Sequence, residues 1–208
     1  DAILMWELGN EYNYNPQWFD GDITNWYKSM ELVAQIIQIE DPSRLVSSAH
    51  GDLPSMDALN IAPSVQVWGM NVYRWDQPQS IFAEWEAISD KPMYLAELGA
   101  DSYMTKSNET YKKGENQRAQ ADANRVILEN VLSNSDKNIG SFVFQFTDGL
   151  WKAGNPKQQD TGGNAPNSDG TPYDGTANEE YWGIVDINRN KKITFDVVKD
   201  AYLNFNIN

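Results

Sequence analysis

The sequence contains no cysteine and only one histidine, His50, among its 208 residues. Without cysteine the chain can form neither a disulfide nor a thiolate metal site. One histidine is also too few for the usual transition-metal centres, so we predict no metal and no cofactor. The absence of cysteine does not place the protein inside or outside a cell.

Positive charge and long apolar runs are also scarce. Lys and Arg number 16 against 30 Asp and Glu, for a net charge of -14 at pH 7. A surface of this sign repels phosphate backbones and anionic lipid headgroups, so we expect no nucleic-acid and no membrane partner. No apolar run approaches the roughly 20 residues that a membrane-spanning helix requires. Neutral or cationic ligands remain as candidates.

The composition that is present is that of an ordinary globular protein. Hydrophobic residues make up 40% of the chain and charged residues 22%, and we predict a single domain over residues 1–208. Aromatic residues are plentiful, with 8 Trp, 10 Tyr and 7 Phe. Because sugar rings stack on exposed aromatic faces, those near strand ends are candidate ligand contacts and the others are candidate core residues.

Short apolar runs alternate with stretches of helical periodicity along the chain. The runs predict strands at residues 3–8, 45–49, 65–73, 93–96 and 141–146. The periodic stretches predict helices at residues 22–40, 80–88, 115–133 and 197–205. Strands that are apolar throughout and alternate with helices favour an α/β fold with a parallel sheet. Five such units fit either a doubly wound sheet or part of a (β/α)8 barrel, which as a whole needs about 250 residues.

A glutamate stands at the tip of two of the apolar runs. Glu11 follows the first run and Glu97 ends the fourth. A carboxylate just past a buried parallel strand lies where barrel enzymes carry their chemistry. Two carboxylates that face one gap are what glycosidic bond cleavage needs, because one donates a proton while the other attacks or activates water. The pair therefore predicts a sugar-cleaving site.

Residues 154–178 interrupt the pattern with a stretch rich in Gly, Asn and Pro that has no periodicity. A structureless segment of this length inside a compact domain is unusual. Since it follows the fifth predicted strand, we interpret it as a long loop after the last strand. It is either a loop that flanks or covers the strand ends or a tolerated surface insertion.

The segment Trp6–Glu11, with its Asn-Glu end, resembles the fourth-strand motif of the retaining glycoside hydrolase clan with (β/α)8 barrels. That clan includes the β-galactosidase/β-glucuronidase-like and cellulase/mannanase-like families. Further segments are similar to its sixth-strand motif, seventh-strand motif, eighth strand and closing segment, in this order: 71–73, 91–99, 144–152 and 181–192. The resemblance implies a TIM-barrel type fold of which this chain supplies strands four to eight. Strands one to three have no counterpart in it.

The resemblance also assigns roles to residues. Glu11 matches the general acid/base, and Glu97 matches the nucleophile, with about 5–5.5 Å expected between the carboxyl groups of a retaining pair. Asn10 matches the residue that binds the sugar 2-hydroxyl, and Tyr73 matches the tyrosine that holds the nucleophile by a hydrogen bond. Asn71 belongs to the same sixth-strand motif and is a further candidate sugar contact.

Four tryptophans are candidate stacking residues. Trp151, after the eighth strand, matches the residue that often floors the sugar site in the clan, and Trp75 and Trp68 follow or lie in the sixth strand. Trp6 lies within a strand, and we expect it in the core. His50 ends the second predicted strand, so we also predict a sugar contact there.

The function implied is a secreted or periplasmic retaining β-glycosidase that acts on a polysaccharide or its oligosaccharides. A transglycosylase would use the same residues, with a sugar acceptor in place of water. A carbohydrate-binding or assembly module that kept the fold without turnover is the alternative from another class. Because a half-barrel exposes two sheet edges, we expect either a dimer or a missing N-terminal segment that completes the barrel. The start at Asp1, next to a predicted core strand, favours a fragment of a longer enzyme.

Overall fold

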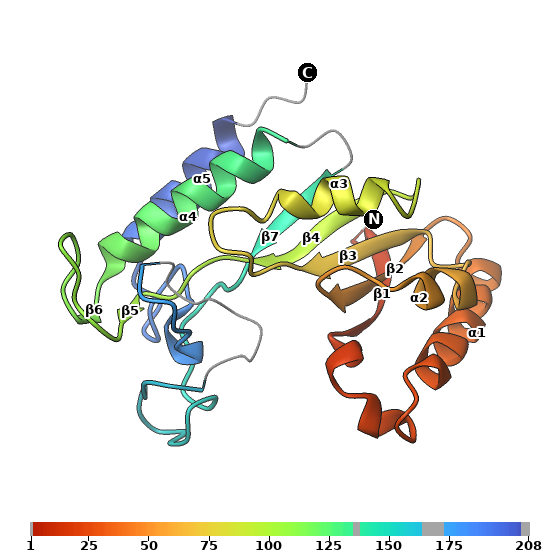
Figure 1. Cartoon of the computed structure of the whole chain (residues 1–208), viewed down its shortest axis with the longest axis horizontal. Helices are drawn as coiled ribbons and strands as arrows, with labels where there is room; N and C mark the ends of the chain where they lie inside the picture. Colours follow the sequence, from red (N-terminus) through yellow and green to blue (C-terminus); the bar gives the residue numbers. More distant parts are fainter. Residues whose placement is uncertain (1, 135–137, 164–172, 205–208) are drawn as a thin grey trace. The chain divides into compact units, whose positions relative to one another are not determined.

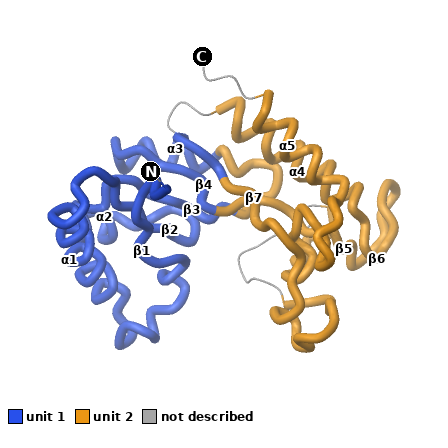
Figure 2. Tube along the Cα trace, turned by 180° about the vertical axis from the view of Figure 1, so that it is seen from behind, with its two compact units in different colours: residues 1–72, 80–96, 136–141 blue, residues 73–79, 97–135, 142–208 orange. Residues whose placement is uncertain are grey.

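The computed structural model describes residues 2–134, 138–163 and 173–204, and the chain divides into two compact units (Figures 1 and 2). Unit 1 consists of Asp1–Val72, Ser80–Ala96 and Asp136–Ser141. Unit 2 consists of Tyr73–Gln79, Glu97–Ser135 and Phe142–Asn208.

A five-stranded parallel sheet is the framework of unit 1, and the ends of its last two strands run into unit 2. Its strands, in spatial order, are β1 (Met5–Asn10), β2 (Leu45–Gly51), β3 (Val67–Asn71), β4 (Met93–Leu98) and β7 (Asn138–Val143). Each predicted apolar run overlaps one of these strands, so the predicted α/β fold is confirmed. The fifth strand was predicted at residues 141–146, three residues later than β7. Among the described residues the sheet does not close into a barrel.

Helices and short turns connect the strands of unit 1. They are η1 (Tyr12–Tyr14), η2 (Pro16–Phe19), α1 (Thr24–Glu40), α2 (Met56–Ile61) and α3 (Ser80–Glu86). Helix α1 begins where the Asp22 carboxylate accepts the N–H of Thr24 at 2.9 Å. Ser55 caps α2 by accepting the N–H of Ala58 at 3.2 Å. Sequence periodicity did not predict α2 because six residues make too few turns for a pattern to repeat.

The two edge strands differ from the prediction that the strands are buried. β2 and β3 are almost entirely buried, whereas Trp6 in β1 is 39% exposed and Phe142 in β7 is 55% exposed. The expectation that Trp6 belongs to the core is therefore wrong. Its indole N–H instead donates to the Asp41 carboxylate at 3.0 Å. An edge strand has a neighbour on one side only, and an apolar sequence cannot show which strands will be edges.

The interior of the sheet contains a hydrogen bond between β1 and β4. The Tyr94 hydroxyl donates to the Glu7 carboxylate and lies 3.4 Å from the Ser47 hydroxyl. Its ring passes directly over Gly69, where a Cβ would lie only 2.5 Å from the ring. A glycine in β3 thus leaves the space through which a β4 side chain reaches β1. Burial raises the pKa of Tyr94 and keeps its hydroxyl a donor.

Two long helices and a small antiparallel hairpin form most of the regular structure of unit 2. Its elements are β5 (Tyr103–Met104), β6 (Gly114–Glu115), α4 (Gln117–Leu132), η3 (Glu179–Tyr181) and α5 (Ile193–Asn204). Helices α4 and α5 run side by side (Figure 1), and the Asn124 amide donates to the Thr194 hydroxyl at 2.8 Å between them. Helix α5 begins four residues earlier than predicted.

A buried ion pair lies beneath the segment that follows β7. Lys192 Nζ is 3.0 Å from Asp148 Oδ1, and the two side chains are 0% and 2% exposed. The same ammonium donates to the Ser102 hydroxyl at 2.8 Å and to the Tyr181 carbonyl at 3.1 Å. Burial raises the pKa of Asp148 and lowers that of Lys192, while each charge opposes the shift of the other. This pair joins the segment after β7 to the residue that precedes α5.

The predicted loop over residues 154–178 includes residues 164–172, which lie outside the described residues. Its first part is held by Glu180, a fully buried side chain that accepts the N–H groups of Ala153 at 2.9 Å and Asp160 at 2.6 Å. Gly162 donates its N–H to the Asn178 side chain at 3.0 Å. Backbone donors without secondary structure are thus paired with buried side chains of unit 2.

Candidate active site

Glu11, the predicted acid/base, comes directly after β1 in unit 1. Its backbone is left-handed, with φ 49°, a conformation that few residues other than glycine adopt. The bend turns the chain from β1 into η1, while the Glu11 N–H still donates to the Ala49 carbonyl at 3.1 Å. The carboxylate oxygen Oε1 accepts a hydrogen bond from Asn71 Nδ2 at 3.0 Å. A strained residue held by contacts on both sides is typical of functional positions.

Asn71 connects the two residues of the Asn-Glu motif. It ends β3, is 2% exposed, and its Nδ2 donates to Asn10 Oδ1 at 3.0 Å as well as to Glu11. The structure therefore brings together Asn10, Glu11 and Asn71, three of the predicted site residues. Asn71 Oδ1 has no hydrogen-bond partner in the described part of the chain, and neither has His50 Nε2.

His50 lies near the end of β2 and is buried, with 4% of its surface exposed. Its Nδ1 is 3.0 Å from the Gly51 carbonyl and 3.2 Å from the Asp52 carbonyl. Two acceptors at Nδ1 favour the tautomer that carries its proton there, which leaves Nε2 as an acceptor. Burial lowers the pKa of His50 although the two carbonyls oppose this shift. The ring is therefore neutral at pH 7.

This lowered pKa predicts a loss of stability on mild acidification. Below pH 6.5 the unfolded chain binds a proton that the folded chain resists until a lower pH, so the stability contributed by neutral His50 falls with pH there. The binding of one proton changes the free energy of unfolding by at most about 1.4 kcal/mol per pH unit. Because the chain has a single histidine, the ring C–H signals in a proton NMR titration report on His50 alone. A midpoint at or above 6.5, or the same acid slope in His50→Gln, would contradict the prediction.

Glu97, the predicted nucleophile, belongs to unit 2 together with its tyrosine. Tyr73 donates its hydroxyl proton to Glu97 Oε2 at 2.7 Å, as predicted from the sixth- and seventh-strand motifs. The Tyr73 ring meets Trp182 edge to face, with centroids 5.1 Å apart and an angle of 86°. Trp182 is 1% exposed and thus holds the tyrosine against rotation. Sequence reasoning missed this role, although the closing-segment motif includes Trp182.

Gly99 allows the end of β4 to approach the chain after β7. Its φ of 147° and a Cβ that would lie 2.8 Å from the Phe144 carbonyl both exclude a larger residue. This close approach allows the Phe144 N–H to donate to the Leu98 carbonyl at 2.8 Å. This close approach lies two residues beyond Glu97. The peptide bond between Phe144 and Gln145 is cis.

The tryptophan predictions have different outcomes. Trp68 is fully buried in β3, 6.4 Å from Trp85 between ring centroids, so its proposed stacking role is wrong and it is a core residue. Trp75 meets Tyr173 edge to face at 5.3 Å. Trp151 is 73% exposed, with Lys152 Nζ 5.7 Å from its ring centroid. It lines a cavity of about 340 Å³ with other residues of unit 2.

The site residues thus fall into two groups, each held within its own unit. Unit 1 positions Asn10, Glu11, His50 and Asn71, and unit 2 contains Tyr73, Trp75, Glu97 and Trp151. Hydrogen bonds join Asn10, Asn71 and Glu11 in the first group, and Tyr73 and Glu97 in the second. Each predicted catalytic carboxylate therefore has a side-chain donor that fixes one of its oxygens.

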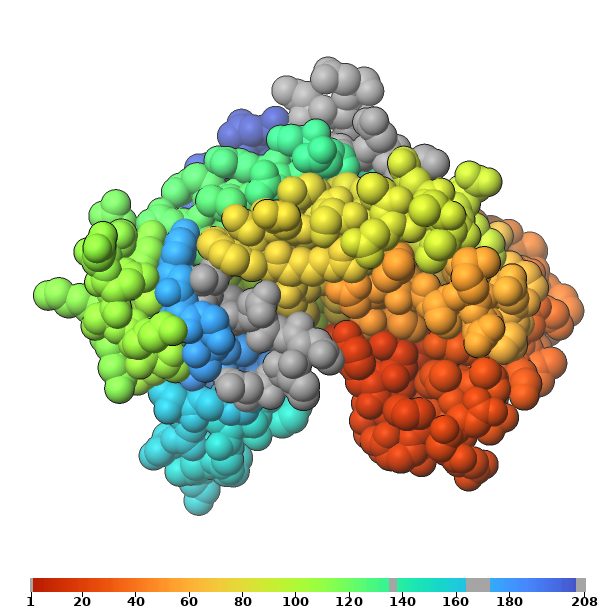
Figure 3. Space-filling view, viewed as in Figure 1, coloured from red at the N-terminus to blue at the C-terminus, as the bar shows by residue number. Residues whose placement is uncertain are grey.

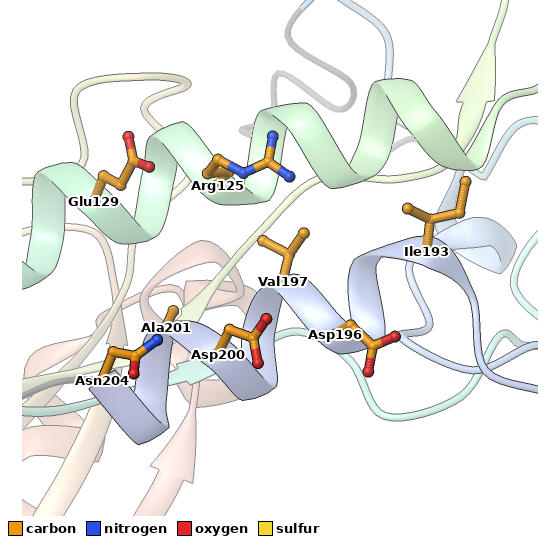
Figure 4. A pocket seen from close by; sticks show the side chains of 8 residues that line it. All are labelled: Arg125, Glu129, Ile193, Asp196, Val197, Asp200, Ala201 and Asn204. Carbon is orange, nitrogen blue, oxygen red and sulfur yellow. The ribbon is translucent and has the colours of Figure 1, made fainter.

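A larger cavity in unit 2 contains none of these residues. It measures about 570 Å³ and lies between α4 and α5 (Figure 4). Its lining consists of Arg125, Glu129, Ile193, Asp196, Val197, Asp200, Ala201 and Asn204. In the described ranges no helix is long and apolar enough to cross a membrane, and no three acidic or histidine side chains are grouped to hold a metal ion.

Known structures with the same fold are carbohydrate-active enzymes. The β-galacturonidase of Eisenbergiella tayi, bound to galacturonate, matches with a TM-score of 0.66 and 21% identity over 99% of this chain and 34% of that chain. The β-D-glucuronidase of Dictyoglomus thermophilum matches with a TM-score of 0.67 and 17% identity over 99% of this chain and 32% of that chain. An active-site mutant of the Rhizomucor miehei β-1,3-glucanosyltransferase, in complex with laminaritriose, matches with a TM-score of 0.61 and 14% identity. The match covers 93% of this chain and 64% of that chain.

These similarities show the fold. The matched structures are glycoside hydrolases with a (β/α)8 barrel, and this chain has the fold of part of such a barrel. It spans about a third of the length of the first two matched structures and less than two thirds of the third. No protein-family model and no curated protein sequence matches the chain.

Proposed function

We propose that the protein is a retaining β-glycosidase that uses Glu97 as nucleophile and Glu11 as general acid/base. The observation that supports this most directly is that each carboxylate is oriented by a matched donor, Tyr73 for Glu97 and Asn71 for Glu11. Glycosidic cleavage with retention requires two carboxylates in different roles. Similarity to glycosidases in fold adds support.

In the first step Glu97 attacks the anomeric carbon and the bond from that carbon to the leaving oxygen breaks. A glycosyl ester forms on Glu97, and Glu11 gives its proton to the departing oxygen. The hydrogen bond from Tyr73 favours the ionised, nucleophilic form of Glu97 before attack. This hydrogen bond weakens when the carboxylate becomes an ester, and the proton from Glu11 neutralises the charge that develops on the leaving oxygen.

In the second step Glu11, now a carboxylate, removes a proton from water as the water oxygen attacks the anomeric carbon. The ester bond breaks, Glu97 is regenerated and the sugar leaves with its original anomeric configuration. Asn10 binds a sugar hydroxyl in this proposal, and its side chain is already oriented by Asn71. The neutral His50 adds a hydroxyl contact, and Trp151 and Trp75 add aromatic surface in unit 2.

Transglycosylation is the second candidate, since a sugar acceptor could replace water in the second step. One matched structure is a β-1,3-glucanosyltransferase, which supports this candidate at the level of fold. A non-catalytic binding module is favoured less, because a module without turnover has no need of an oriented pair of carboxylates. The proposal also includes a secreted or periplasmic location, where an extracellular polysaccharide would be within reach.

We also propose that further strand–helix units cover β1 and α1, supplied by a preceding segment of a longer chain or by a second copy. Large apolar side chains there are strongly exposed in unit 1: Leu4 at 79%, Ile39 at 76%, Leu32 at 63% and Ile36 at 57%. Leu4 directly precedes β1 and the other three lie on α1, and monomeric proteins rarely expose large contiguous apolar patches. The β1 edge also offers backbone groups for pairing with another strand.

Covalent labelling tests the catalytic proposal. We expect a panel of 2-deoxy-2-fluoro β-glycosides with good leaving groups to add one glycosyl unit to Glu97, located by mass spectrometry of peptides. Glu97→Gln should stay unlabelled, while Tyr202→Ala, on α5, should label as the wild type does. Labelling at another residue, or no labelling by any glycoside of the panel, contradicts the proposal. The mass of the labelled particle in solution tests the covering units, since a labelled monomer of these 208 residues alone would contradict them.

A further inference from the structure

The turn after Glu11 is more rigid than its irregular structure suggests. In η1 the Tyr12 hydroxyl lies 2.8 Å from the Ser48 hydroxyl. The Asn13 side chain accepts the N–H of Gly51 at 2.8 Å and donates to the Gly51 carbonyl at 3.0 Å. Both backbone groups of the last residue of β2 are therefore paired with one amide. In Figure 3 the red atoms of the N-terminal part of the chain form a projection on the surface of unit 1.

Tyr14 is the last residue of η1, and its ring lies against the backbone at Gly51. A Cβ at Gly51 would be 2.2 Å from Tyr14 Cε2, so the ring occupies the place where a side chain of residue 51 would be. The Tyr14 N–H donates to the Glu11 carbonyl at 3.2 Å. Although its ring is supported in this way, Tyr14 remains 39% exposed. An aromatic ring is thus held firmly three residues from the proposed acid/base with part of its surface open to solvent.

Two carboxylates act electrostatically on the Tyr14 hydroxyl. Burial first, and then the negative charges of Glu11 and Asp52, together raise the pKa of Tyr14 to about 12. The hydroxyl therefore stays protonated at neutral pH and can donate a hydrogen bond to an acceptor there. The ring and its polar tip together suit a ligand that has both C–H faces and hydroxyl groups.

We propose that Tyr14 is a binding platform for the sugar or aryl group that leaves with the glycosidic oxygen. The inference rests on the proposed function, because the acid/base protonates that oxygen and the departing group is therefore next to Glu11. The electron-rich face of an aromatic ring attracts the C–H groups of a pyranose. A ring fixed before binding loses little conformational entropy when the ligand arrives, so its contact contributes to affinity efficiently.

The test compares substrates with and without a leaving group that can stack. Tyr14→Ala and Tyr14→Phe are assayed with a β-linked disaccharide and with the β-glycosyl fluoride of the same sugar. Tyr202→Ala is the matched control, since Tyr202 is 40% exposed and lies on α5 in unit 2. We expect Tyr14→Ala to raise KM for the disaccharide about tenfold, as befits one lost aromatic contact, and to leave fluoride turnover unchanged. Tyr14→Phe should retain most of the disaccharide affinity.

The fluoride substrate separates a binding role from a structural one. Equal losses with both substrates in Tyr14→Ala would mean that the residue only supports the fold of the turn, and would overturn the inference. Unchanged disaccharide kinetics in Tyr14→Ala, with an active wild type, would overturn the inference and leave the proposed function intact. A wild type inactive towards both substrates, across the same sugar panel, would overturn the proposed function and the platform with it.

Discussion

Glu97→Gln is expected to abolish turnover of β-glycosides to below about one part in a thousand of the wild-type kcat/KM. An amide of the same shape accepts the Tyr73 hydrogen bond but cannot form the glycosyl ester, so the first step has no nucleophile. The loss should not depend on the leaving group, because every substrate needs the attack. Steady-state rates with a series of aryl β-glycosides measure this directly.

Glu11→Gln is the informative companion to that variant. Loss of general acid catalysis lowers rates by about 100- to 10,000-fold, and most for leaving groups that need the proton. We therefore expect turnover of unactivated disaccharides to be lost, while an activated dinitrophenyl glycoside still forms the ester. If Glu11→Gln slowed all leaving groups equally, or if Glu97→Gln kept a leaving-group-dependent fraction of its rate, the assigned roles would be wrong.

Lys192→Met is expected to destabilise the chain by about 3–5 kcal/mol, the usual result of removing one partner of a buried ion pair. Lys192 and Asp148 are 0% and 2% exposed, so the remaining carboxylate cannot reach water. The substitution also removes the donor to the Ser102 hydroxyl and the Tyr181 carbonyl. Urea unfolding, followed by tryptophan fluorescence, measures the change.

Two controls make this prediction specific to burial. Lys152→Met breaks the Lys152–Glu179 pair at 2.7 Å, whose side chains are 23% and 12% exposed, and should lower stability by about 1 kcal/mol or less. The double substitution of Lys192→Met with Asp148→Leu should recover much of the loss, because no charge is left buried. Similar effects of Lys192→Met and Lys152→Met would contradict the argument.

The elements of the fold could be predicted where the local pattern repeats often enough. Helix α1 was expected at residues 22–40 and spans Thr24–Glu40, because its apolar positions recur over four turns. Helix α2 was missed because six residues offer no such recurrence. The antiparallel pair β5 and β6 has two residues in each strand, and no alternation can be read from so short a segment.

Burial depends on neighbours distant in sequence, and here sequence reasoning failed. Trp6 and Trp68 are the same residue type in similar apolar runs, yet Trp6 is 39% exposed and Trp68 is fully buried. β1 is an edge of the sheet, whereas β3 lies between β2 and β4. Strand order is a property of the tertiary structure, so it decides which tryptophan packs in the core.

In the candidate site, too, some features follow from the sequence and others only from the tertiary structure. The sequence by itself determined the chemical types, namely Glu11 after an Asn, Glu97 at a strand end and Tyr73 in the preceding motif, because these follow from residue identity and local order. Only the tertiary structure decided that Asn71 orients Glu11 from 60 residues away, that Trp182 holds Tyr73, and that Tyr14 lies on Gly51. Each of these contacts joins segments that are brought together by the packing of strands and helices, and packing distances are not encoded in any local pattern.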